Sequence, residues 1–184
     1  NKAPKPSVPS KALIFSPHPD DDVISMGGTL IQLADNGYEV HVAYQTSGNI
    51  AVFDDEVIRF MQFSMDFLPK DERLKSSYMQ ILDAFNRKKI GDIDTKQIQL
   101  LKGSIRKGEA LAACRVCGVL EENAHFMNLP FYETGAVKKK PHSKNDVDMT
   151  VALLNKLRPS KIFAAGDLSD PHGTHRVCLQ ILFD

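Results

Sequence analysis

The sequence predicts an α/β protein with a Rossmann-like, doubly wound, mostly parallel sheet and helices on both faces. Apolar runs of strand length at residues 11–16, 39–46 and 161–165 alternate with segments whose apolar residues recur at helical spacing. This alternation is typical of parallel strands joined by crossover helices. Two of these strands are followed by histidine and aspartate, and ligands of such folds bind at the carboxyl ends of strands.

Length and composition favour one domain that buries a substantial core. The chain has 184 residues, of which 42% are hydrophobic. Its size suits a single core. Basic and acidic residues number 23 each, and tryptophan is absent. A formal net charge of zero argues against nucleic acid or an anionic membrane as the partner, because both attract a basic surface.

The two ends of the chain predict a piece of a longer protein. Residues 1–10 contain three prolines and two lysines and are expected to be an extended linker, with the domain over residues 11–184. The chain begins without methionine and stops at an apolar run, residues 181–183. We therefore expect the domain to be incomplete at its carboxyl end and an upstream domain to be plausible.

Targeting signals and disulfide patterns are missing from the sequence. No apolar run approaches the ~20 residues of a membrane helix, and the amino terminus lacks the apolar core of a signal peptide. Three cysteines, an odd number, form no disulfide framework. A cytoplasmic protein without a membrane span is the resulting expectation.

The first helix is expected over residues 24–36. Gly37 supplies the left-handed residue that ends it. Gly27 and Gly28 are expected to let the helix approach the sheet closely, since a glycine pair alone is weak support for a phosphate-binding loop. The inner side of the helix is expected to hold Leu30, Ile31, Leu33 and Ala34.

Three further helices are expected over residues 54–67, 72–87 and 94–118. The apolar stripes of the first two contain Val57, Phe60, Met61, Phe63, Ile81, Leu82 and Phe85. The third contains Cys114 and Cys117 in a C-x-x-C pattern. A thioredoxin-type pair lies at a helix start after a strand, so burial of both thiols is favoured over a redox or metal site.

The last third of the chain is expected to complete the sheet. A strand over residues 123–129 leads into a loop, residues 130–135, that should border the pocket. A helix over residues 146–157 precedes the strand at 161–165, and another helix opens at His172. The basic run at residues 137–140 is most simply a solvated loop, although lysines near a pocket could steer a phosphorylated sugar.

Histidine and aspartate follow two strands that are far apart in sequence. His18 and Asp21 are spaced so that both can reach one cation. The acids from Asp20 onward could instead cap the next helix, but capping requires neither the histidine nor three acids. A second cluster runs from Asp167 to His175. Its alternative is a helix start with two exposed imidazoles, and the first cluster makes a shared metal site the better interpretation.

Together these motifs resemble the PIG-L/LmbE family of zinc-dependent de-N-acetylases. The His-Pro-Asp-Asp sequence at residues 18–21 is similar to the first motif of that family, and residues 172–175 are similar to its later His-x-x-His motif. Residues 46–48, and Arg106 with Glu109, resemble further motifs. The resemblance covers most of the chain and implies removal of an N-acetyl group from an amino sugar of the N-acetylglucosamine type, or from its phosphate.

Hydrolytic zinc sites use three protein ligands and leave one position for water. His18, Asp21 and His175 supply that number. Zn²⁺ is the expected cofactor, exchangeable with Fe²⁺ or Co²⁺. The resemblance implies that Asp20 is the general base, and His172 is expected to stabilise the oxyanion or protonate the leaving amine.

The substrate is expected to contact residues after the second strand and near the predicted loop. Ser47, Gly48 and Asn49 follow that strand, Tyr132 borders the strand-end crevice, and Arg106 is assigned by family analogy. The resemblance also implies that such domains occur fused to glucosamine-6-phosphate deaminase domains. A fused upstream domain and a homo-oligomer are therefore partners that the sequence leaves open.

One difference from the family concerns His172. The family usually has His-Pro-Asp-His, whereas residues 172–175 read His-Gly-Thr-His, so the acid that orients the first histidine is missing. Either Asp167 or Asp170 is expected to replace it, or His172 is less well poised.

Two other functions remain open at this point. Residues 20–22 could serve a magnesium-dependent phosphoryl transfer, but such sites prefer oxygen ligands to the histidines found here. The chain could also be an amino-sugar-sensing domain attached to a deaminase, with its metal site kept and turnover lost.

Overall fold

The computed structural model describes residues 10–167 and 169–184. These residues divide into two compact units: residues 10–47 with 107–184, and residues 48–106. The expectation of a single domain did not distinguish these two units. Nine of the ten residues of the predicted linker lie outside the described residues.

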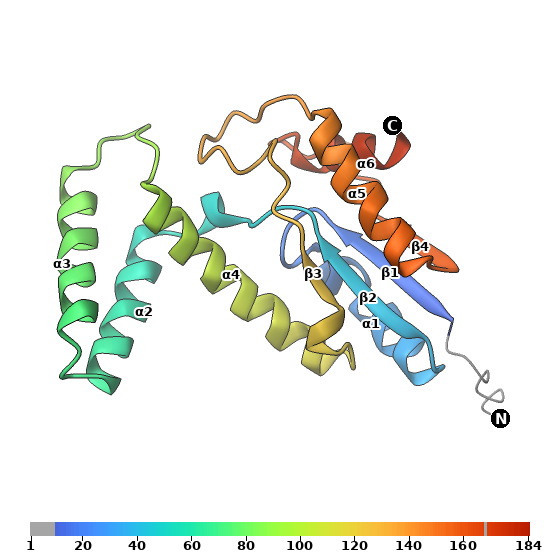
Figure 1. Cartoon of the computed structure of the whole chain (residues 1–184), viewed down its shortest axis with the longest axis horizontal. Helices are drawn as coiled ribbons and strands as arrows, with labels where there is room; N and C mark the ends of the chain where they lie inside the picture. The colour runs from blue at the N-terminus through green and yellow to red at the C-terminus, as the bar shows by residue number, and fades with distance from the viewer. Residues whose placement is uncertain (1–9, 168) are drawn as a thin grey trace. The chain divides into compact units, whose positions relative to one another are not determined.

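The first unit contains a parallel sheet of four strands in its described part, in the order β3-β2-β1-β4 (Figure 1). The strands are β1 (Lys11–Ser16), β2 (Glu39–Tyr44), β3 (Ala124–Phe126) and β4 (Lys161–Ala164). The chain moves from β1 outward to β3 and then returns to the other side of β1 for β4. The fold class is thereby confirmed, and the switch in direction lies between β1 and β4, where ligands of such folds bind.

Helices cover both faces of this sheet. One face packs against α1 (Asp21–Asp35) and the carboxyl-terminal half of α4 (Lys96–Val116), and the other packs against α5 (Lys144–Leu157) and α6 (Thr174–Phe183). Alternate strand residues point to opposite faces, and here both faces are covered, so β1 contains the continuous apolar run of residues 12–15. The α1 side buries Ile14, Val42 and Leu30, and the α5 side buries Leu13, Phe15 and Leu157.

The structure corrects two expectations for α1. Ile31 is 42% exposed, so the inner face is narrower than predicted. A Cβ atom added at Gly28 would have no other atom within 4 Å, and one added at Gly27 would meet only Val23 of the same helix. The glycines therefore do not bring α1 close to the sheet. They follow a break in the helix at Met26, whose φ is −147°.

The second unit is helical in its described residues. It contains a short 3₁₀ turn (Asn49–Ala51), α2 (Asp54–Phe67), α3 (Glu72–Arg87) and the first part of α4, and α2 and α3 have the predicted bounds. Val57, Met61, Ile81 and Ile98 form its core. Phe60 and Phe63, predicted to lie in the apolar stripe, are 44% and 68% exposed.

A charged cluster ties α4 to α2 within the second unit. The Lys102 ammonium is 2.6 Å from Asp54 Oδ1 and 2.7 Å from Asp94 Oδ2, and Lys102 is almost fully buried. Lys88 bridges the same two carboxylates. Burial opposes ionisation of Asp54, but hydrogen bonds from Lys102 and Lys88 outweigh it and hold its pKa below the ordinary value.

The cysteines are free and buried, which confirms the expectation of burial for the C-x-x-C pair. Cys114 lies in the last turn of α4, and Cys117 follows its end. Burial raises the pKa of both thiols, opposite to the shift that a reactive cysteine needs. Among the described residues, no helix is long and apolar enough to cross a bilayer.

Candidate metal centre

The turn after β1 places His18 and Asp21 at the edge of the sheet. The Ser16 hydroxyl accepts the main-chain N–H of Asp22 at 3.0 Å and thus caps the first turn of α1. Asp20 occupies the N-cap position, but its carboxylate accepts no capping hydrogen bond. Capping therefore does not account for the Asp20 side chain.

Asp22 points into the protein rather than toward the edge. Its carboxylate accepts the Tyr44 hydroxyl at 2.9 Å and is 3.3 Å from the Ser16 hydroxyl. Burial raises the pKa of Asp22 in spite of these hydrogen bonds. Asp22 thus anchors the turn that carries His18 and Asp21.

Three side-chain atoms that can bind a metal ion lie close together at the switch point of the sheet. Asp21 Oδ2 lies 3.1 Å from His18 Nδ1 and 3.2 Å from His175 Nε2, and the two ring nitrogens are 3.2 Å apart. A tetrahedral zinc site with bonds of about 2.0–2.1 Å separates its ligand atoms by about 3.3–3.4 Å. The donor types and their spacing therefore fit a zinc-type ion, and these residues form a group that could hold one.

The main chain orients the carboxylate of Asp21. The main-chain N–H of His18 donates to Asp21 Oδ2 at 2.8 Å. Burial opposes ionisation of Asp21, but hydrogen bonds from His18 and the charges of His18 and His175 hold its pKa below the ordinary value. A cation would find the carboxylate already ionised.

Asp170 positions His175 through the main chain. Its two carboxylate oxygens accept the N–H groups of His172 and His175, each at 3.1 Å, just before α6. Gly173 at the N-cap has a φ of 72°, which glycine adopts without strain. Burial opposes ionisation of Asp170, yet these hydrogen bonds lower its pKa.

The structure corrects the helix start that was expected at His172. Helix α6 begins at Thr174, so His172 lies before the helix. His172 is exposed, and its ring makes no hydrogen bond to Asp167 or Asp170 in the described part of the chain. Asp167 instead lies 4.0 Å from His175 Nδ1. The catalytic role of His172 stays a prediction.

The predicted substrate residues divide between the two units. Tyr132 is buried, and its ring lies edge-on to His18 with centroids 6.0 Å apart. Ser47 belongs to the same unit, whereas Gly48, Asn49 and Arg106 belong to the second unit. All five roles stay predictions.

Glu133 was missed by the sequence analysis, although it lies in the loop predicted to border the pocket. Its two carboxylate oxygens accept the main-chain N–H and the hydroxyl of Ser47, at 2.9 and 3.0 Å. This pairing joins the loop after β2 to the loop after β3, and it positions Ser47.

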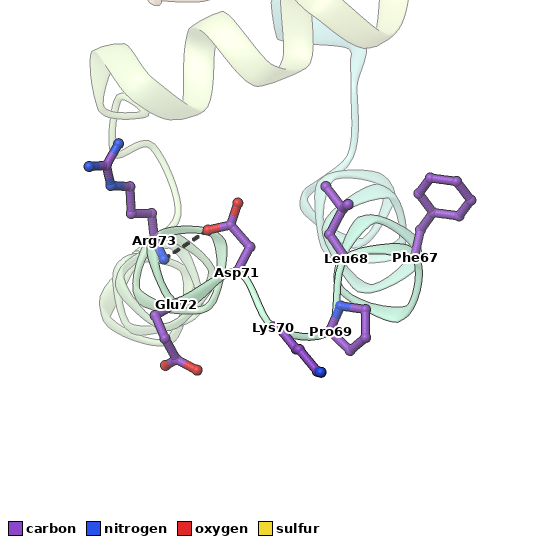
Figure 2. Close-up of a pocket in the computed structure, with 7 residues that line it drawn as sticks. All are labelled: Phe67, Leu68, Pro69, Lys70, Asp71, Glu72 and Arg73. Atoms are coloured by element: carbon purple, nitrogen blue, oxygen red, sulfur yellow. Dashed lines mark hydrogen bonds between the residues drawn. The ribbon is translucent and has the colours of Figure 1, made fainter.

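The second unit has a groove at the turn between α2 and α3. This groove does not resemble a catalytic site. It is lined by residues 67–73 (Figure 2). The carboxylate of Asp71 accepts the main-chain N–H groups of Arg73 and Leu74 and so caps α3. The groove is a feature of the helix connection.

The chain is an α/β protein with a parallel, doubly wound sheet. Two histidines and one aspartate meet at the switch point of this sheet, and they form a candidate metal centre of the kind found in hydrolases. The chain belongs to the GlcNAc-PI de-N-acetylase (PIG-L) family, whose model matches residues 13–184. The expected family is thereby confirmed.

Two curated relatives agree with this family. A putative glucosamine-6-phosphate deaminase-like protein of Bacteroides thetaiotaomicron is 50% identical over 180 residues, which cover 95% of this chain and 27% of that protein. A diacetylchitobiose deacetylase of Thermococcus kodakarensis is 43% identical over 47 residues, 26% of this chain and 18% of the relative. The chain thus spans about a quarter or less of either relative.

Two solved structures share the fold. The N,N'-diacetylchitobiose deacetylase of Pyrococcus horikoshii has a TM-score of 0.56 at 20% identity, over 95% of this chain and 49% of that one. GalB, a 4-carboxy-2-hydroxymuconate hydratase of Pseudomonas putida, has a TM-score of 0.57 at 19% identity, over 94% and 53%. The fold therefore carries at least two chemistries, so the reaction has to be argued from the site.

Proposed function

We propose that this chain is a zinc-dependent hydrolase domain that removes the N-acetyl group of an N-acetylglucosamine-type sugar or its phosphate. The observation that carries the proposal is the convergence of His18, Asp21 and His175 within 3.2 Å of one another at the switch point. Two imidazoles and one carboxylate are a ligand set of hydrolytic zinc, and Fe²⁺ or Co²⁺ could exchange with it.

The similar proteins support the substrate class. The family is named for de-N-acetylation, one relative is named a deacetylase of a diacetylated amino sugar, and another is named after glucosamine 6-phosphate. A fused deaminase domain, a homo-oligomer and a cytoplasmic location stay predictions.

The residues of the chain divide the work of amide hydrolysis. A bound zinc ion lowers the pKa of a coordinated water to about 7. Asp20 directly precedes the proposed ligand Asp21, and we assign to it the role of accepting the proton of the attacking water. His172, when protonated, donates to the departing amine, so that the C–N bond breaks into acetate and a free amino sugar. His18, Asp21 and His175 hold the ion.

Metal analysis with two neighbouring variants tests this proposal. The dialysed wild-type protein should retain about one zinc per chain. Asp21→Ala should lose it, whereas Asp20→Asn should keep it and lower kcat by about 10²–10⁴. The matched control is His142→Ala, because His142 pairs with Asp184 away from the three ligands.

The outcomes separate the alternatives. Equal zinc loss in Asp20→Asn and Asp21→Ala would show that the base is misassigned. Full zinc occupancy without release of acetate from either sugar would favour the sensing domain. A zinc-soaked structure in which the three side chains point apart would refute the metal site.

A further inference from the structure

Lys139 differs from the lysines on either side of it. Lys138 and Lys140 are exposed, as the expectation of a solvated loop requires, whereas Lys139 is half-buried. Its ammonium lies 3.8 Å from the centroid of the Tyr132 ring and donates to the carbonyl of Ala136 at 3.2 Å. Within the described part of the chain it forms no ion pair within 4.0 Å.

Tyr132 fixes this ammonium close to the candidate metal centre. The Tyr132 ring also approaches His18 edge-on, with 6.0 Å between centroids. The loop beneath it is held by Asp146, which is fully buried and accepts the N–H of Phe131 at 3.0 Å. One aromatic ring, that of Tyr132, therefore lies against both the ammonium of Lys139 and the ring of His18, a candidate metal ligand.

Holding this cation there has an electrostatic cost. Burial lowers the pKa of Lys139 to about 8, and the negative charge of Glu133 offsets this only in part. A flexible lysine whose only role was solubility would extend into water, as its neighbours do. An anion bound to the ammonium of Lys139 would offset this desolvation cost.

We propose that Lys139 binds the phosphate of a phosphorylated N-acetyl amino sugar and so selects it over the neutral sugar. This inference rests on the proposed function. A lysine binds phosphate as a point charge, and the chain as a whole has no net charge to attract an anion.

The test compares two sugars and two lysines. Zinc-loaded wild type, Lys139→Met and Lys138→Met are assayed for acetate release from N-acetylglucosamine 6-phosphate and from N-acetylglucosamine. Lys139→Met should lower kcat/KM for the phosphorylated sugar about 10- to 100-fold, mainly through KM, and leave the neutral sugar unchanged. Lys138→Met should change either value by less than about threefold.

Two further readouts separate charge from packing. Lys139→Arg keeps the charge and should restore at least part of the preference. In wild type the preference for the phosphorylated sugar should fall as the pH rises through about 8, where Lys139 loses its proton. The ratio of kcat/KM for the two sugars is measured, because the pH dependence of their shared hydrolytic step cancels in this ratio.

Each remaining outcome decides the inference. Equal loss on both sugars would assign Lys139 a structural role, and no loss would refute it. If the wild type hydrolyses neither sugar, the proposed function fails. The role of Lys139 in phosphate binding is then tested separately, by calorimetric measurement of glucosamine 6-phosphate binding to wild type and to Lys139→Met. Binding that is at least tenfold weaker in Lys139→Met supports the inference, and equal binding overturns it.

Discussion

Replacement of Asp170 by alanine should both destabilise the protein and weaken the metal centre. Asp170 is 8% exposed and accepts the N–H groups of His172 and His175, each at 3.1 Å. Loss of a side chain that accepts main-chain N–H groups at a helix start costs about 1 kcal/mol, and hydrogen bonds to a charged group contribute more. We expect a loss of about 2 kcal/mol, or about 4–8 °C in Tm for a chain of this size.

Urea unfolding of the zinc-free protein measures this loss without the metal. Asp148→Ala is the matched control, because Asp148 forms an exposed pair with Lys144 on α5. Such a pair contributes only about 0.3–0.5 kcal/mol. Zinc affinity, measured by chelator competition, should fall about tenfold in Asp170→Ala, since His175 loses the contact that holds its main chain.

The pH dependence of the stability of Asp170→Ala, compared with that of wild type, tests the electrostatic part of the stabilisation by Asp170. The pKa of Asp170 is lower in the folded state than in the unfolded chain. Its stabilising effect is therefore fully present above the unfolded pKa of about 3.9 and is lost as the pH falls through the lower folded pKa. A destabilisation no larger than that of Asp148→Ala, or an unchanged zinc affinity, would refute the assigned role.

Two further predictions concern groups away from the metal centre. Lys102→Met should destabilise the protein by about 1–3 kcal/mol, because two partly buried carboxylates lose one of the two cations that they share and keep only Lys88. The exposed pair of Lys75 should contribute less than about 1 kcal/mol, and equal urea midpoints for Lys102→Met and Lys75→Met would contradict this. Cys114 and Cys117 should react with a thiol reagent only as fast as the protein unfolds, since burial raises the pKa of both thiols, and rapid labelling of the native protein would show that the pair is accessible.

Sequence patterns were sufficient where the deciding signal is local. The bounds of α2 and α3 follow from periodicity and flanking residues, and both were predicted correctly. The meeting of His18 with His175 was also predictable, although 157 positions separate them. Both follow parallel strands, and the carboxyl ends of parallel strands share one edge of a sheet.

Periodicity shows which residues share a helix face, but it does not show whether another element covers that face. Ile31 and Phe63 belong to apolar stripes and are nevertheless exposed. The width of the covered stripe depends on which neighbours pack against the helix, and those neighbours come from other parts of the chain.

The partners of the polar side chains around the centre also required the tertiary structure. Asp170 was one of two acids expected to orient the ring of His172. It accepts main-chain N–H groups instead, and α6 begins two residues later than predicted. Glu133 with Ser47, and Lys139 with Tyr132, have no spacing rule that would pair them. The sequence by itself determined the fold class and the residue types delivered to one edge of the sheet. Only the folded loops decided which side chains meet there, because a hydrogen bond requires positions within a few tenths of an ångström, and loop conformation sets them.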